Sequence, residues 1–109
     1  MSMIRKYKVE DTAALEAAWR AATRIAHPFL DHSFVEQEAD MLRRVYLPHS
    51  ETWVIETEGD PVGFIALNGD EIGGLFLDPS CHGKGLGRAL VDHAIALKGP
   101  MWLEVFEKN

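Results

Sequence analysis

The sequence lacks the features that mark exported and membrane-spanning chains. It has one cysteine, Cys81, and no uncharged run near the ~20 residues that a membrane-spanning helix needs. A single cysteine cannot build a disulfide framework and is typical of a reducing compartment. The first residues, MSMIRKYKVED, contain no apolar signal core. We therefore predict a soluble, cytoplasmic protein.

Positive charge is also scarce. The chain has 11 lysines and arginines against 17 aspartates and glutamates, which gives a formal net charge of −6. This acidic balance argues against nucleic acid or an anionic membrane as the main partner. With 109 residues, 47 % of them hydrophobic, the chain has the length of one domain, and no repeat or low-complexity tract divides it.

The hydrophobic pattern changes its period along the chain and indicates an α/β (α+β) domain. Ser33 and Glu36 match a capping box before a second helix, and Glu58-Gly59-Asp60 is typical of a hairpin turn. The adjacent Gly73 and Gly74 predict a bulge or a close approach by another group. The predicted order is β-α-α-β-β-β-α-β, with a strand at 3–9, helices at 11–26 and 34–46, strands at 52–57, 61–68 and 71–77, a helix at 87–97 and a strand at 101–107.

The segment after the strand at 71–77 carries the strongest chemical signal. A tight loop with glycines at 83, 85 and 87 leads directly into a helix. Unpaired amides at a helix start attract anions, and glycines let a phosphate approach the backbone. Lys84 and Arg88 add cationic donors. We predict a phosphate or pyrophosphate site, the alternative being a tight turn that needs glycine only for its backbone angles.

Two nucleotide-binding patterns resemble parts of this loop. A P-loop, G-x-x-x-x-G-K-[ST], fails because Lys84 precedes Gly85 and no serine or threonine follows in register. A dinucleotide fingerprint, G-x-G-x-x-G, begins at Gly83 or Gly85, but its third glycine is replaced by Arg88 or Leu90. Glu104 stands near the distance of a ribose-binding acid, so the dinucleotide interpretation stays open.

The run from His82 to Gly87 resembles the [RQ]-x-x-G-x-[GA] coenzyme A signature of the GNAT acetyltransferase superfamily, with histidine in place of the usual Gln or Arg. The surrounding IGGLFLDPSCHGKGLGRALVDHA is similar to that family's fourth strand and third helix, and the resemblance extends over the whole chain. It implies a mixed, mainly antiparallel sheet with flanking helices, and one acetyl-CoA-binding domain over residues 1–109. The family's final helix and two closing strands would follow Asn109.

The resemblance implies acetyl-CoA as cosubstrate and transfer of its acetyl group to a primary amine of a small molecule or protein, by direct attack in a ternary complex. The backbone of Leu75, Phe76 and Leu77 would contact the pantetheine arm, and the amide near Leu77 would bind the oxyanion. The Gly73-Gly74 pair would splay the fourth and fifth strands apart. The pyrophosphate would lie on the loop made of His82, Gly83, Lys84, Gly85, Leu86, Gly87 and Arg88.

The amine must lose a proton, so a general base is expected. Glu104 is the first candidate, because strand alternation places it on one face with Trp102 and Phe106, an apolar setting that raises a carboxylate's pKa. It also stands where family members carry a glutamate base. The alternative is a structural glutamate paired with a lysine or arginine. Glu71, at the start of its strand, is the second candidate.

Other side chains were considered for the acceptor and for metal. The resemblance implies an acceptor pocket near Trp19, His27, Phe29 and Leu30, although Trp and Phe on a helix face are equally typical of core. Cys81 beside the helix start could be a nucleophile, but it is small enough to be structural. The five histidines, His27, His32, His49, His82 and His93, show no metal-ligand spacing, so no metal is expected.

The predicted last strand, 101–107, bears on assembly. Without closing strands it would leave an open edge and an apolar face that includes Trp102 and Phe106, so we predict a homodimer through it. The family's proton-donating tyrosine lies in the helix beyond Asn109, and neither Tyr7 nor Tyr46 lies in the matching element. The alternative function is therefore a non-catalytic module that binds coenzyme A or mediates dimerisation.

Overall fold

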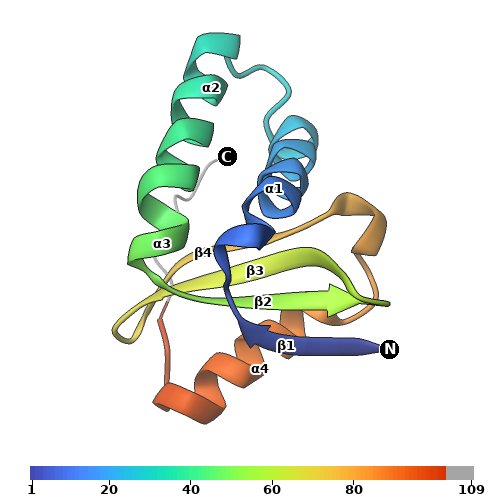
Figure 1. The fold of residues 1–109 in the computed structure, drawn as a ribbon, viewed down its shortest axis with the longest axis vertical. Coiled ribbons are helices and arrows are strands. Elements are labelled where there is room, and N and C mark those ends of the chain that lie inside the picture. Colours follow the sequence, from blue (N-terminus) through green and yellow to red (C-terminus); the bar gives the residue numbers. More distant parts are fainter. Residues whose placement is uncertain (103–109) are drawn as a thin grey trace.

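The structure is a computed structural model that describes residues 1–102. A four-stranded antiparallel sheet in the order β1-β2-β3-β4 forms its centre. In Figure 1, α1 and α2 lie on one face of this sheet and α4 lies on the other. The elements are β1 (Ser2–Lys6), α1 (Thr12–Ala26), α2 (His32–Met41), a π-helical segment (Leu42–Tyr46), α3 (Leu47–His49), β2 (Glu51–Thr57), β3 (Asp60–Asn68), β4 (Glu71–Leu77) and α4 (Leu86–Lys98), with 3-10 turns at Val9–Asp11 and Pro79–Cys81.

The predicted fold class and the element order through α4 are confirmed. Of the predicted strand at 101–107, the described part includes only Trp102, which forms a parallel bridge to Glu71. The rest of that strand, with Glu104 and Phe106, lies outside the described residues. The homodimer through it stays a prediction.

The start of the second helix was predicted wrongly. α2 begins at His32 and its N-cap is Asp31, which has extended backbone angles, so Ser33 lies inside the first turn. The Ser33 hydroxyl donates to Asp31 Oδ2 at 2.7 Å, and Glu36 accepts two hydrogen bonds from Arg20 instead of closing a capping box. Asp31 holds the N-cap position without a side-chain capping hydrogen bond, and the Ser33 hydroxyl cannot cap the helix while it donates to the Asp31 carboxylate.

Two apolar cores lie on opposite faces of the sheet, because side chains alternate along each strand. On the α1–α2 face the largest contributor is Phe64, buried with side chains of both helices. On the α4 face Ile65 and Leu90 are the centre of a second cluster. The neighbouring Phe64 and Ile65 of β3 thus anchor different cores, and removing a buried side chain of this size typically costs about 2–5 kcal/mol.

A β-bulge in β4 interrupts the alternation, as the two adjacent glycines predict. Ala66 of β3 is paired with Gly74 and Leu67 with Ile72, so Gly73 is the extra residue. In strict alternation Ile72 would share the face of Phe76. The inserted glycine moves Ile72 to the α4 face, where it is buried with Leu67.

An ion-pair cluster joins the start of the chain to the sheet. Arg5 of β1 makes two hydrogen bonds of 2.8 Å to the carboxylate of Asp11, just before α1, and one of 2.7 Å to Glu56 of β2. The Lys8 amide also donates to Asp11. Asp11 is buried, and the hydrogen bonds from Arg5 hold the pKa of its carboxyl below the ordinary value.

We predict that Asp11→Asn lowers the free energy of unfolding by about 2–3 kcal/mol at pH 7, because it leaves the Arg5 charge partly unpaired. A depressed folded-state pKa stabilises the fold above the carboxyl's unfolded pKa, and the contribution disappears as the pH falls through the folded value. The difference between wild type and variant should therefore shrink between pH ~5 and ~2. Urea unfolding at several pH values measures this.

The control is Glu58→Gln, which removes an exposed ion pair with the N-terminal amine. We expect it to change stability little at any pH. A constant difference between wild type and Asp11→Asn across the acid range would contradict the assigned role of the Asp11 charge.

Candidate functional site

The turn after β4 is fixed by one aspartate. Asp78 Oδ1 accepts hydrogen bonds from the Ser80 amide at 2.9 Å and the Ser80 hydroxyl at 2.7 Å. These bonds lower the pKa of the Asp78 carboxyl. The Asp78 amide donates to Val62 of β3, and its carbonyl accepts from the Cys81 amide. The loop therefore leaves the end of β4 in a defined direction, with Cys81 buried beneath it.

Beyond this turn the backbone takes a shape that requires glycine. Gly83 and Gly85 have φ values of +79° and +78°, and Gly85 is the N-cap of α4. The first backbone bond of the helix is donated by Ala89 to the Gly85 carbonyl. Within residues 1–102 the amides of Gly85–Arg88 donate to no acceptor. Such a row of free amides at a helix start is an anion-binding arrangement.

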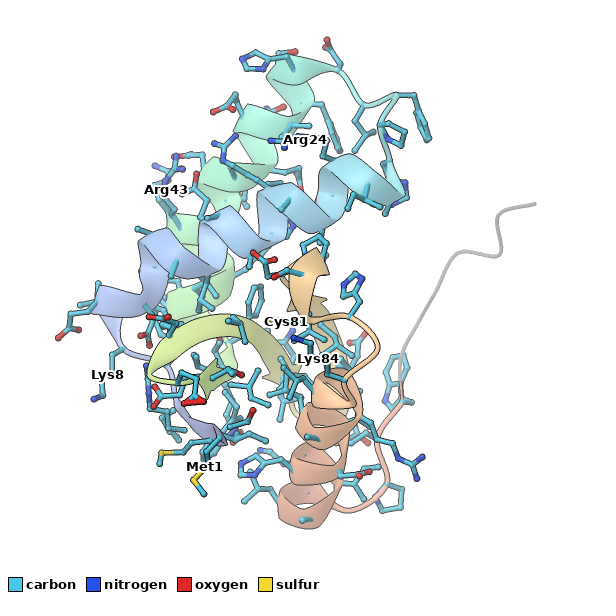
Figure 2. The ribbon with its side chains drawn as sticks, turned by 90° about the vertical axis from the view of Figure 1, so that its right-hand side faces the viewer. Met1, Lys8, Arg24, Arg43, Cys81 and Lys84 are labelled. Carbon is cyan, nitrogen blue, oxygen red and sulfur yellow. The ribbon has the colours of Figure 1, made fainter. Side chains whose placement is uncertain are left out.

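Cationic side chains surround these amides. Lys84 is exposed, and so is Arg88, whose nearest carboxylate oxygen, on Asp92, is 3.7 Å away. The exposed His82 precedes them. In Figure 2, Cys81 and Lys84 lie in the loop that connects the sheet to the start of α4. Gly87 faces β4, since a Cβ there would lie 3.3 Å from Leu77 Cδ1, so the helix start packs closely on the end of the strand.

The outer edge of β4 extends from this loop. At its far end the Ile72 amide donates to the Trp102 carbonyl at 2.9 Å, and the Trp102 amide donates to Asp70 at 3.1 Å. From Gly73 to Leu77 no strand of the described chain pairs with this edge. Half the peptide groups of a strand edge face outwards, so this stretch can accept an extended ligand.

A cavity of about 390 Å³ opens on the α1–α2 face beside the bulge. Its floor includes Gly73 and Gly74, where a side chain on Gly73 would come within 2.7 Å of the Asn68 amide nitrogen. Its walls come from α1, α2, the π-helical segment and β3. The lining residues are Trp19, Glu38, Leu42, Tyr46, Ser50, Phe64, Ala66, Asn68, Gly73, Gly74 and Phe76.

The structure separates the residues predicted for the acceptor. Trp19 lies in the wall of this cavity, whereas His27 and Leu30 line a second cavity between the ends of α1 and α2. Phe29 lines neither and is exposed, with its ring edge-on to His27 at 5.9 Å between centroids. Phe76 faces the first cavity, while Leu75 and Leu77 pack on the α4 side.

Of the predicted bases, Glu104 lies outside the described residues. Glu71 is half-buried opposite Asn68 and does not line the cavity. Sequence reasoning missed two titratable residues that do, Glu38 and Tyr46. Glu38 is half-buried and forms no ion pair within residues 1–102. The sequence signal for Glu38 was its spacing of four residues from Leu42, because this spacing places both side chains on one helix face, and Leu42 is buried.

Among residues 1–102, no group of three or more His, Cys, Asp or Glu side chains is arranged to hold a metal ion. None of the helices in that part of the chain combines the length and apolarity of a membrane span.

Comparisons with known proteins agree with this geometry. Residues 12–109 match the Acetyltransferase (GNAT) family. The chain is 36 % identical over its full length, and over 75 % of the relative, to peptidyl-lysine N-acetyltransferase YjaB of Salmonella typhimurium. The apo solution structure of YjaB from Escherichia coli superposes with a TM-score of 0.87 at 33 % identity, covering 98 % of this chain and 73 % of that one. The PaiA N-acetyltransferase of Thermoplasma acidophilum, solved with coenzyme A, shares the fold at a TM-score of 0.82 and 19 % identity, over 100 % and 82 % of the two chains.

A glycine-rich loop after the fourth strand of such a sheet, beside a cavity and a strand edge left unpaired within residues 1–102, is typical of an acyltransferase of the GNAT type. The chain belongs to the acetyltransferase (GNAT) family.

The loop geometry predicts a specific stability effect. Gly85→Ala should lower the free energy of unfolding by about 1 kcal/mol, because its Cβ is unfavourable at positive φ. Gly87→Ala should have little effect, because its φ is ordinary and only the flexible end of Leu77 must move. Urea unfolding of both variants tests this. Equal losses would contradict a left-handed conformation at Gly85.

Proposed function

We propose that this protein transfers the acetyl group of acetyl-CoA to the side-chain amine of lysine in a polypeptide. The main support for the proposal is that three structural features lie next to one another: the start of α4, the edge of β4 and the cavity at the bulge. Among residues 1–102, the amides at the start of α4 donate to no acceptor and adjoin the edge of β4 that no described strand pairs with, and that edge leads to the cavity floor at Gly73 and Gly74. Together they offer a place for a phosphate group, an extended arm and a reacting end.

The loop supports binding of the pyrophosphate. The backbone amides between Gly83 and Arg88 would hold its oxygens, with Lys84 and Arg88 as exposed cations and His82 as a further polar neighbour. A side chain at Gly85 would be strained at φ +78°. The formal charge of the whole protein is −6, so these local donors matter for attracting a polyanion.

The pantetheine arm would lie along β4 from Leu77 through Phe76 and Leu75 towards the bulge. Its amides can pair with outward-facing peptide groups, as an added strand does. These five residues, Gly73–Leu77, span about 17 Å in extended form. The thioester would then reach the cavity next to Gly73 and Gly74, and a nearby β4 amide, the one at Leu77 being the sequence-based candidate, would stabilise the oxyanion.

The reaction is a direct transfer. The unprotonated amine nitrogen attacks the thioester carbonyl carbon, the C–N bond forms, and the carbonyl oxygen becomes negative. The C–S bond then breaks and the electron pair leaves with the sulfur of coenzyme A. The nitrogen loses two protons in all: the ammonium gives one to a base before the attack, and the second leaves as the intermediate collapses and passes to the departing sulfur or to water. A thiol has a pKa near ~8.5, so the thiolate is a stable leaving group that needs little help from an acid.

Glu38 is the carboxylate that we propose for binding the lysine ammonium and accepting its proton. It lines the cavity, is half-buried and faces the same space as Trp19 and Gly74. Glu71 and Glu104, the sequence-based candidates, remain proposals for the same role. The Tyr46 phenol in the cavity wall can donate a hydrogen bond to the departing sulfur.

Two observations support a lysine acceptor. The chain is 36 % identical to proteins named peptidyl-lysine N-acetyltransferase. The cavity is lined by aromatic and aliphatic groups around one carboxylate, which suits a long apolar stem with an ammonium at its end.

We predict that acetyl-CoA binds the chain in calorimetric titration and that Gly85→Glu weakens binding at least tenfold, because a carboxylate would face the pyrophosphate. Gly59→Glu is the matched control. Gly59 also has a positive φ, +85°, and also leaves its side chain open space, but it lies in the β2–β3 turn. Equal binding by the two variants would contradict the loop assignment.

We predict that Glu38→Gln lowers kcat/KM for a lysine peptide by roughly 10²-fold, with acetyl-CoA binding unchanged. Glu71→Gln and Glu104→Gln are compared in the same assay, and Glu58→Gln, in the hairpin turn, is the control. A loss confined to one of the other two would assign the base to that residue. Binding of acetyl-CoA without transfer to any lysine peptide would favour the non-catalytic module.

A further inference from the structure

A second cavity, of about 330 Å³, lies between the end of α1 and the beginning of α2. Pro28, Leu30 and Val35 form apolar parts of its wall. The polar lining includes Thr23, Arg24, His27 and His32. It shares no lining residue with the cavity at the bulge. The function proposed above leaves it without a role.

The charge in this cavity is positive. Arg20 donates to both carboxylate oxygens of Glu36, at 2.5 and 2.9 Å, and to Glu16 at 2.8 Å, so the one acidic residue in the lining is already neutralised. Arg24 forms no ion pair within residues 1–102 and is exposed. Figure 2 shows Arg24 on the side of α1 that faces α2. In a protein with net charge −6, a free arginine beside a neutralised carboxylate is a local anion site.

A nearly buried threonine lies at the same cavity as this charge. Thr23 is 9 % exposed and lines the cavity, yet within the described chain its hydroxyl makes no hydrogen bond. Within residues 1–102, the one side-chain N or O atom that is fully buried and without a hydrogen-bond partner is His93 Nε2. The Thr23 hydroxyl oxygen is therefore still reached by solvent. Water in the cavity can therefore bond this hydroxyl, and a ligand oxygen that enters the cavity can replace that water. The positive end of α2 lies at the same cavity through His32, its first residue.

We propose that this cavity binds the carboxylate of an acidic side chain in the acceptor polypeptide, close in sequence to the acetylated lysine. Arg24 would make the charged hydrogen bonds and Thr23 would donate from its hydroxyl. This inference rests on the proposed function and adds a preference for acidic residues near the acceptor. A carboxylate fits because it needs donors only, and arginine and a hydroxyl supply them.

The spacing follows from α1. Trp19, in the wall of the first cavity, and Thr23, in the second, are one turn apart on the same helix face, and Arg24 and His27 lie further along. The two cavities are therefore roughly 6–12 Å apart along the helix at 1.5 Å per residue. An extended peptide covers that distance in about two to four residues. The acidic side chain is expected at that separation from the lysine.

The test uses lysine peptides that carry Glu or Gln two, three or four positions from the acceptor, measured for acetyl transfer and, separately, for binding by fluorescence anisotropy. For the wild type we expect kcat/KM to be about tenfold higher with Glu than with Gln at the preferred position. Arg24→Gln should abolish this preference. Its kcat/KM for the Gln peptide should stay within about twofold of the wild-type value. Arg44→Gln, which removes an exposed charge outside both cavities, should keep the preference.

Each outcome separates the carboxylate site from the proposed function. Equal transfer to Glu and Gln peptides at every position overturns the inference and leaves the function standing. If no peptide is acetylated but Glu peptides still bind better through Arg24, the function fails and the site stands. A separate binding titration with glutarate tests whether the cavity binds a free carboxylate that is not part of a peptide. Binding of glutarate through Arg24, with no preference among peptides, would overturn the assignment to an acceptor side chain.

Discussion

The single extra residue in β4 is the constraint on which the site depends. Because Gly73 is an extra residue in β4, the strand residues before it point to the opposite sheet face from the one that strict alternation would give them. Ile72 fills the core under α4, while Phe76 and the bare Gly74 turn towards α1 and α2. A cavity floor without side chains and an intact core on the opposite face result from the same backbone irregularity. Trp102 pairs with β4 at Glu71 and Ile72, next to the bulge, and within residues 1–102 no strand pairs with the outer β4 edge from Gly73 onward.

Ion pairs link the two helices above that floor, in addition to their apolar contacts. Glu16 accepts hydrogen bonds from Arg20 on its own helix and from Arg43 on the π-helical segment, while Arg20 also bonds to Glu36 of α2. Burial on its own raises the pKa of Glu16, but the hydrogen bonds from Arg43 and Arg20 outweigh it, and the net pKa is lowered. The cluster holds α1 and α2 together across the cavities, where apolar packing is interrupted, and leaves Arg24 without a partner inside residues 1–102.

Features that depend on neighbours in sequence were predictable. The hairpin turn, the bulge at paired glycines and the anion loop follow from backbone preferences of a few consecutive residues. Where two residues of the type favoured at helix starts stand close together, the prediction failed, and Asp31 rather than Ser33 is the N-cap residue of α2. The walls of the cavities could not be predicted, because the presence of Glu38 and Tyr46 beside Gly74 depends on how α2 and the π-helical segment lie over the sheet. The same orientation places Trp19 and His27 in different cavities, although Trp19 lies in α1 and His27 is the C-cap of that helix.

The position of β1 at the edge of the sheet has a consequence for the order of assembly. The strands β2, β3 and β4 follow one another through short turns, so their pairing closes only small loops. β1 instead pairs with β2 across a wide gap, with Ser2 meeting Thr57, 55 positions away. Closing a long loop costs more chain entropy than closing a hairpin, and contacts of long sequence separation form slowly. We therefore expect the three-strand meander of β2, β3 and β4 to pair before β1 joins its edge.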